Sequence, residues 1–219
     1  MTNLAKLTFC GGAVGSCSAA AAGYHFLNKS THQETPKSKK TVGDSLRDEK
    51  FVLLSYTDGN SSEWSKVLEK YKSSGEESKF SGVNLSAESA KDNDNIAQLK
   101  EKCKSIVEGE FEQGIHDKAK KWCVVPQNLR ERMTALSVTA LDYSNEKDKN
   151  TSTDSWKEKI KTYKGDEGLS SSSTWSSASG EDDKVEAIKK DCKSFLEGET
   201  RSYDSDFEEK YKKAIAWCA

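Results

Sequence analysis

The chain has 219 residues, of which 34% are hydrophobic and 32% are charged, and its 34 Lys and Arg nearly balance its 36 Asp and Glu. This length accommodates one large domain or two small ones, and the low hydrophobic fraction argues against a single deep core. The balanced charge excludes the basic footprint by which nucleic-acid-binding proteins are recognised. No nucleic-acid partner is therefore expected.

The N-terminal segment 1–28 differs in composition from the rest of the chain. The stretch Leu7–Leu27 contains no charged residue, and its length of about 21 residues matches a helix that crosses a bilayer. We therefore expect a transmembrane anchor or signal segment over 1–28, with an uncleaved single-pass anchor favoured. Lys6 followed by a short apolar run also fits a cleaved secretory signal. Val14-Gly15-Ser16-Cys17 resembles a bacterial lipobox with Cys17 as the lipidated residue, and a buried or disordered N-terminus of a soluble protein is the remaining alternative.

The polar composition of residues 29–40 predicts a solvated linker. This segment contains four lysines, Lys29, Lys37, Lys39 and Lys40. Lysines on this flank favour a body that stays in the cytoplasm, because cytoplasmic flanks are enriched in positive charge. A signal-like segment favours export instead. We expect a single-pass protein of the cell membrane with an extracellular body, and a cytoplasm-facing body is the alternative.

The body contains two copies of one sequence unit, the first over 41–123 and the second over 124–219. Five apolar positions of the first unit recur in the second at a single offset of 89, namely Ile96, Leu99, Cys103, Ile106 and Val107 against Val185, Ile188, Cys192, Phe195 and Leu196. Trp64 and Tyr71 recur with the same separation as Trp156 and Tyr163, and Trp-Cys closes both units. Leu46-Arg47-Asp48 corresponds to Leu129-Arg130-Glu131. With this correspondence, the segment between the motif and the next apolar run is four residues longer in the second unit. Such internal similarity indicates a duplicated unit.

Each unit reads as a small cluster of three or four helices, so the fold class is mainly α. Ser45-x-x-Asp48 and Asn128-x-x-Glu131 are typical of capping boxes that begin a short helix. The apolar runs 51–56 and 138–143 predict either a short β-strand or an extended connector. Helical spacing of apolar residues predicts further helices around Trp64–Tyr71 and Trp156–Tyr163, over 95–108 and 184–197, and before each Trp-Cys. The serine-rich segments 73–89 and 170–179 are expected to be loops.

Four cysteines of the body lie at matching places in the two units. Cys103 and Cys123 belong to the first unit, and Cys192 and Cys218 belong to the second. The duplication favours one disulfide within each unit, and closing loops of this length adds roughly 3 kcal/mol to stability. The alternative is four buried thiols. The cysteine spacing does not fit a zinc site, and no metal is expected.

Candidate catalytic residues are few. The only histidine of the body, His116, occupies the place of Tyr211 in the second unit, which indicates a half-buried packing site rather than a general base. The Glu108-Gly-Glu110 and Glu197-Gly-Glu199 pairs fit solvated helix ends, although paired carboxylates also occur in hydrolases. No phosphate-binding glycine motif is present. We therefore expect no catalytic residue, cofactor or small-molecule substrate.

Trp175 stands apart from the other tryptophans. It lies in the serine-rich run 170–179 and has no counterpart in the first unit. An aromatic side chain in a polar loop is a candidate contact for a partner, against simple packing on the core.

The Gly- and Ala-rich N-terminal segment, the Leu-Arg-Asp and Leu-Arg-Glu starts, the Trp-x6-Tyr helices and the Cys…Trp-Cys endings resemble large paralogous families of proteins from haemotropic mycoplasmas. The stretch Val125-Pro126…Leu129-Arg130-Glu131-Arg132 contributes most to this resemblance. Those families are regarded as surface or host-interacting products, so the resemblance implies no enzyme activity and supplies no site residues. The expected function is a membrane-anchored surface protein with a host-interaction or antigenic-diversity role and an unknown protein or host-surface partner. A cytoplasm-facing adaptor and a carboxylate-dependent hydrolase are the alternatives.

Overall fold

A computed structural model describes residues 39–219 except 58, 145–151, 164–168 and 170–172. The described residues are mainly helical, as expected, and contain no β-strand beyond two isolated bridges, Thr41 with Glu110 and Leu53 with Val124. The apolar runs 51–56 and 138–143 are therefore extended connectors rather than strands. The predicted anchor, most of the linker, and Cys17 lie outside the described residues. Among the helices within them, none is both long and apolar enough to cross a membrane.

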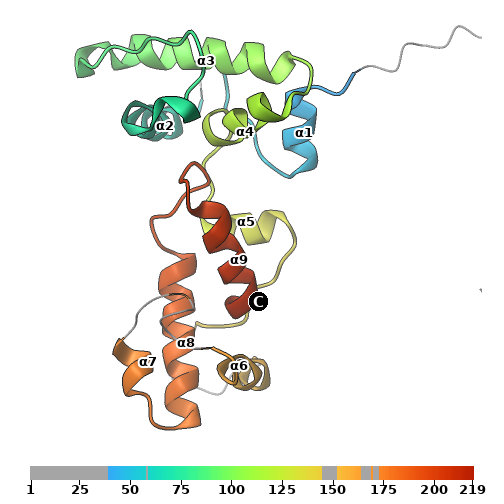
Figure 1. The fold of residues 1–219 in the computed structure, drawn as a ribbon, viewed down its shortest axis with the longest axis vertical. Coiled ribbons are helices and arrows are strands. Elements are labelled where there is room, and N and C mark those ends of the chain that lie inside the picture. Colours follow the sequence, from blue (N-terminus) through green and yellow to red (C-terminus); the bar gives the residue numbers. More distant parts are fainter. Residues whose placement is uncertain (1–38, 58, 145–151, 164–168, 170–172) are drawn as a thin grey trace, which may run out of the picture. The chain divides into compact units, whose positions relative to one another are not determined.

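The first unit (41–123) is built around one long helix. Helix α3 (Asp92–Glu108) packs against α1 (Val42–Asp48), α2 (Ser61–Ser73) and α4 (Gln113–Trp122), as Figure 1 shows. The segment 73–89, predicted as a loop, contains the short 3-10 helix Glu76–Ser78, and a second one at Ser89–Lys91 leads into α3. A buried cluster that includes Leu46, Trp64, Leu99 and Trp122 forms the core of this unit.

The second unit (124–219) has a comparable arrangement around α8 (Glu181–Leu196). This helix packs against α5 (Leu129–Ala135), α6 (Thr153–Ile160), α7 (Ser173–Ser177) and α9 (Phe207–Cys218) (Figure 1). A separate buried cluster that includes Met133, Trp156, Ile188 and Phe207 forms its core. The serine-rich run 170–179 was predicted as a loop, but part of it forms α7, which packs on α8.

Capping boxes begin the first helix of each unit, although one of them is not where the sequence pattern placed it. In α5, Asn128 and Glu131 form the predicted reciprocal hydrogen bonds. In α1 the box is formed by Thr41 and Asp44, and the prediction at Ser45 is wrong because Ser45 lies inside the helix with its side chain buried. The two N-cap residues, Thr41 and Asn128, are 87 positions apart in the sequence. The two helices therefore do not align Leu-Arg-Asp with Leu-Arg-Glu, which are separated by a different number of residues.

The same tertiary contacts recur around the matching tryptophans. The indole Nε1 of Trp64 donates to the carbonyl of Ser55, and that of Trp156 donates to the carbonyl of Asp142. The backbone amides of Leu54 and Leu141 donate to the carbonyls of Cys123 and Cys218, which ties each connector to the end of the last helix of its unit. Tyr71 meets Trp122 edge-on with ring centroids 5.1 Å apart, and Tyr163 meets Trp217 in the same way at 5.2 Å.

The two predicted disulfides are present. Cys103 of α3 is bonded to Cys123 at the end of α4, and Cys192 of α8 is bonded to Cys218 of α9. All four sulfurs are inaccessible to solvent, in the cores of their units. Each disulfide thus fastens the long central helix to the last helix of the same unit.

Candidate functional site

The Glu-Gly-Glu motifs occupy helix ends, where they make different contacts in the two units. Glu110 is exposed and pairs with Lys39 at 2.9 Å. Glu197 accepts hydrogen bonds from Arg130 at 2.9 Å and from the hydroxyl of Tyr143 at 3.3 Å. Glu199 is fully exposed, 3.9 Å from Arg201. The two motifs lie in separate units, and the carboxylates of Glu110, Glu197 and Glu199 each lie near a cation of their own.

His116 is buried, rather than half-buried as its sequence position suggested, with 4% of its surface exposed. Its Nε2 lies 2.8 Å from a carboxylate oxygen of Glu49 and its Nδ1 lies 3.5 Å from one of Asp117. Neither contact has the alignment of a hydrogen bond. The ring also packs against Phe111, with centroids 5.3 Å apart. His116 therefore fills a packing site beside two carboxylates, as predicted for a position that tolerates His or Tyr.

Trp175 lies in α7 and is half-buried. It meets Tyr163 edge-on at 4.7 Å between ring centroids, and the ammonium of Lys184 lies 5.9 Å from its ring. Part of the indole thus covers the core of the second unit. Its predicted contact with a partner would have to use the part of the ring that remains exposed.

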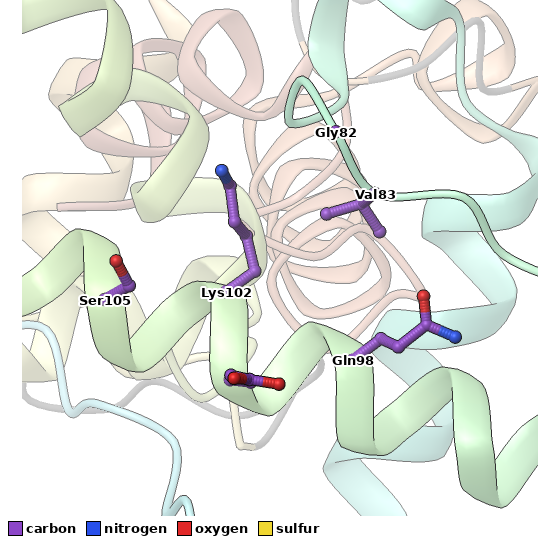
Figure 2. A pocket seen from close by; sticks show the side chains of 6 residues that line it. Gly82, Val83, Gln98, Lys102 and Ser105 are labelled. Carbon is purple, nitrogen blue, oxygen red and sulfur yellow. The ribbon is translucent and has the colours of Figure 1, made fainter.

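Among the shallow pockets of the described residues, two lie beside features that the sequence singled out or that differ between the units. The first, of about 350 Å³, lies between α3 and the loop that follows the first 3-10 helix, and Figure 2 shows Gln98 and Lys102 extending from α3 on the side of this loop. Its remaining lining residues are Gly82, Glu101 and Ser105. This lining offers one cation and one carboxylate but no nucleophile paired with a base. It could hold a polar group without acting on it.

The second pocket, of about 340 Å³, lies beside Tyr143 in the second unit. The guanidinium of Arg130 lies 5.6 Å from the Tyr143 ring centre and shares Glu197 with the tyrosine hydroxyl. Burial raises the pKa of Tyr143, while the positive charge of Arg130 opposes this shift and Glu197 adds to it. The hydroxyl stays protonated at neutral pH and serves as a hydrogen-bond donor.

The matching place in the first unit has no such network. Tyr56 takes the place of Tyr143, its hydroxyl is buried without a hydrogen-bond partner, and burial raises its pKa to about 12. Gly43 takes the place of Arg130. A Cβ atom at Gly43 would come within 2.9 Å of the carbonyl oxygen of Val107, so α1 lies too close to α3 for a side chain there.

The two units meet through a small set of polar and aromatic contacts. Arg132 of α5 donates to the carbonyl of Glu49 at 2.9 Å, and its guanidinium lies 3.8 Å from the centre of the Phe51 ring. Lys120 of α4 pairs with Glu208 of α9 at 2.6 Å. Further along, Tyr203 stacks on Trp122 and Lys70 pairs with Asp204. The end of α1 and the end of α4 in the first unit are thereby covered by the second unit.

The corresponding positions of the second unit carry apolar side chains that are partly exposed, namely Leu136, Val138, Ile215 and Trp217. The ammonium of Lys159 donates to the carbonyl of Ala216, between the last two of them. Leu136 and Ile215 keep 36% and 38% of their surfaces exposed. Trp217 is half-buried, whereas its counterpart Trp122 is only 1% exposed. The sequence pattern did not reveal this difference in exposure, because it depends on what covers the equivalent positions of the first unit.

Comparisons of the chain with protein-family models, with curated proteins and with solved structures find no match. In the described part of the chain, no three His, Cys, Asp or Glu side chains gather as they would around a metal ion.

Proposed function

We propose that this chain is a membrane-anchored, exported protein whose duplicated helical body acts in binding to other proteins rather than in catalysis. The observation that carries the proposal is the pair of buried disulfides behind a charge-free N-terminal segment. Disulfides form and persist in oxidising, extracytoplasmic environments and are rare in the cytosol. Small units with thin cores also need such links for stability.

The arrangement of fixed and varying parts supports a binding role. The tryptophan, tyrosine and cystine contacts recur in both units, whereas the loops between them differ in length and sequence. A recurring scaffold with dissimilar loops is suited to recognition, because surface loops change without loss of the core. The resemblance to surface protein families of haemotropic mycoplasmas points the same way.

A structural role for the Glu-Gly-Glu motifs supports the non-catalytic reading. Glu110 and Glu197 are held by cations and hydrogen-bond donors. A carboxylate-dependent hydrolase would need two such groups to face one substrate. Alanine replacement of Glu110 and Glu199 tests this alternative, since loss of a measured hydrolytic activity would establish it.

The decisive experiment is protease treatment of intact cells, followed by peptide mapping of residues 41–219. We expect body peptides to be released before lysis, while a cytoplasmic marker protein stays intact. Alkylation of free thiols before reduction should leave the four body cysteines unlabelled. Protection of the body until lysis would contradict the proposal and favour the cytoplasm-facing adaptor that the lysine-rich flank suggests.

A further inference from the structure

The segments that lead into the central helices α3 and α8 correspond to each other in the structure. The backbone amide of Phe80 donates to the hydroxyl of Tyr71 at 2.8 Å. In the second unit, the amide of Leu169 donates to the hydroxyl of Tyr163 at 3.4 Å. Phe80 and Leu169 are 89 positions apart, which is also the offset between the matching apolar positions of α3 and α8. The two segments can therefore be compared position by position.

One position of this segment is a tryptophan in the second unit and a serine in the first. Trp175 and Ser86 are again 89 positions apart, as are Lys184 and Asn95. The ammonium of Lys184 lies 5.9 Å from the centre of the Trp175 ring. The side chain of Asn95 exchanges two hydrogen bonds with the backbone of Ser86. Ser86 thus lies on the first unit where Trp175 lies on the second.

The space that the Trp175 indole occupies in the second unit corresponds to a pocket in the first. The indole meets Tyr163 edge-on, with ring centroids 4.7 Å apart. In the first unit, Ser86 and Tyr71, the counterpart of Tyr163, line one pocket of about 450 Å³. Ligand sites in proteins have volumes of roughly 300–1,000 Å³. The serine side chain is too small to fill this space, so the pocket has room for an aromatic group from elsewhere.

The wall of this pocket carries two cations. Lys72 and Lys79 both line it, and the ammonium of Lys79 lies 6.0 Å from the centre of the Tyr71 ring. Glu76 is the carboxylate among the lining residues, and it pairs with Lys79 while its side chain stays 90% exposed. An ion pair with so exposed a partner contributes little stability, so another carboxylate can replace Glu76 at low cost. The pocket therefore favours an aromatic group that has negative charge beside it.

We propose that this pocket binds an aromatic side chain that lies within an acidic segment of a partner protein. The second unit supplies the precedent, because its own Trp175 packs beside the matching tyrosine. The two lysines would pair with acidic residues that flank the aromatic one, and a cation near an aromatic ring adds a further attraction. This inference rests on the binding role proposed above and names the chemistry that the partner presents.

The test uses the full chain in detergent micelles, with empty micelles as the blank. The probe is the peptide acetyl-Glu-Trp-Glu-amide with a fluorine atom on the indole. Because the protein contains no fluorine, fluorine NMR of the peptide reports its binding alone. We expect this peptide to bind about threefold more tightly than acetyl-Lys-Trp-Lys-amide labelled in the same way, because its carboxylates meet the two lysines. An unlabelled peptide with alanine in place of tryptophan should not displace it.

Two substitutions place the binding in this pocket. Ser86→Trp should weaken binding by at least about tenfold, because the new indole would fill the pocket and deny the peptide its buried aromatic contact. The hydrogen bonds to Asn95 use the backbone of Ser86 and are retained, and circular dichroism checks that the helix content is unchanged. Lys79→Glu should reverse the preference between the two peptides, since it replaces a cation of the wall by a carboxylate.

The matched control is Ser86→Ala. It removes a hydroxyl that accepts from the amide of Glu88 but leaves the pocket open, so it should bind the peptide as the unmodified chain does. Absence of peptide binding, unchanged binding by Ser86→Trp, or equal binding of the two charged peptides would each overturn the proposal. Protease accessibility in cells separates this failure from failure of the proposed function, because it does not depend on the pocket.

Discussion

Removal of one disulfide at a time tests how the two units are stabilised. Replacing Cys103 and Cys123 by alanine opens a link with a sequence separation of 20, and replacing Cys192 and Cys218 opens one with a separation of 26. In the chain-entropy description, a cross-link closing a loop of this length stabilises the fold by about 3 kcal/mol. Because small domains are stable by about 5–15 kcal/mol, either replacement should remove a large share of the total.

The loop lengths also predict that the two replacements cost nearly the same. The closure entropy depends on the logarithm of loop length, so sequence separations of 20 and 26 give similar values. The expected difference in the free energy of unfolding is only about 0.2 kcal/mol. A clear asymmetry would show that the units differ in native packing around the sulfurs, all of which are buried.

The assay is urea unfolding of the purified chain followed by circular dichroism, with Cys10 and Cys17 replaced by serine in every variant to prevent thiol exchange. Hydrogen exchange should show lost protection in α3 and α4 for the first replacement and in α8 and α9 for the second. Unfolding at an unchanged urea concentration, with an unchanged slope, would refute the reasoning that these links stabilise the units.

Three further changes test individual contacts. Tyr56→Phe should leave the free energy of unfolding unchanged or raise it, because the hydroxyl it removes is buried without a partner. Tyr143→Phe should instead lower it by about 0.5–1.5 kcal/mol through loss of a hydrogen bond, and thermal unfolding compares the two variants directly. Arg132→Ala should lower stability by about 1–3 kcal/mol, since it removes both a hydrogen bond and a cation–π contact between the units, and Arg132→Lys measured in urea should recover only part of this. A hydrogen bond from Lys72 lowers the pKa of Asp92 in the folded protein. The stabilisation that this interaction gives is present above the ordinary aspartate pKa near 3.8, and it is lost as the pH falls through the lower pKa of the folded state. Asp92→Asn should therefore lose less stability than the unmodified chain between pH 6 and pH 2.5, and equal losses in acid titrations would contradict this assignment.

Much of the secondary structure and the cysteine pairing followed from the sequence by itself. The recurrence of apolar positions at helical spacing indicated α3 and α8, because that spacing reflects the side of the helix that must be buried. The cysteines recur at the same landmarks, so the duplication favoured one pairing of the three that four cysteines allow. The Asn128 capping box was also predicted correctly, since the side chains and backbone amides that form it belong to residues close together in the sequence.

Only the tertiary structure decided which local similarities were in register and which surfaces were covered. The Leu-Arg-Asp motif resembles its counterpart locally, but Ser45 is buried within α1 and the capping box begins at Thr41 instead. A side chain at position 43 would collide with the backbone of Val107, a residue distant in the chain, and this accounts for the glycine there. Leu136, which follows α5, and Ile215 of α9 stay exposed, whereas Trp122 of the first unit is covered by Tyr203 of the second. Local sequence patterns specify how a segment folds and which of its sides is apolar, whereas covering that side depends on residues brought near by the fold.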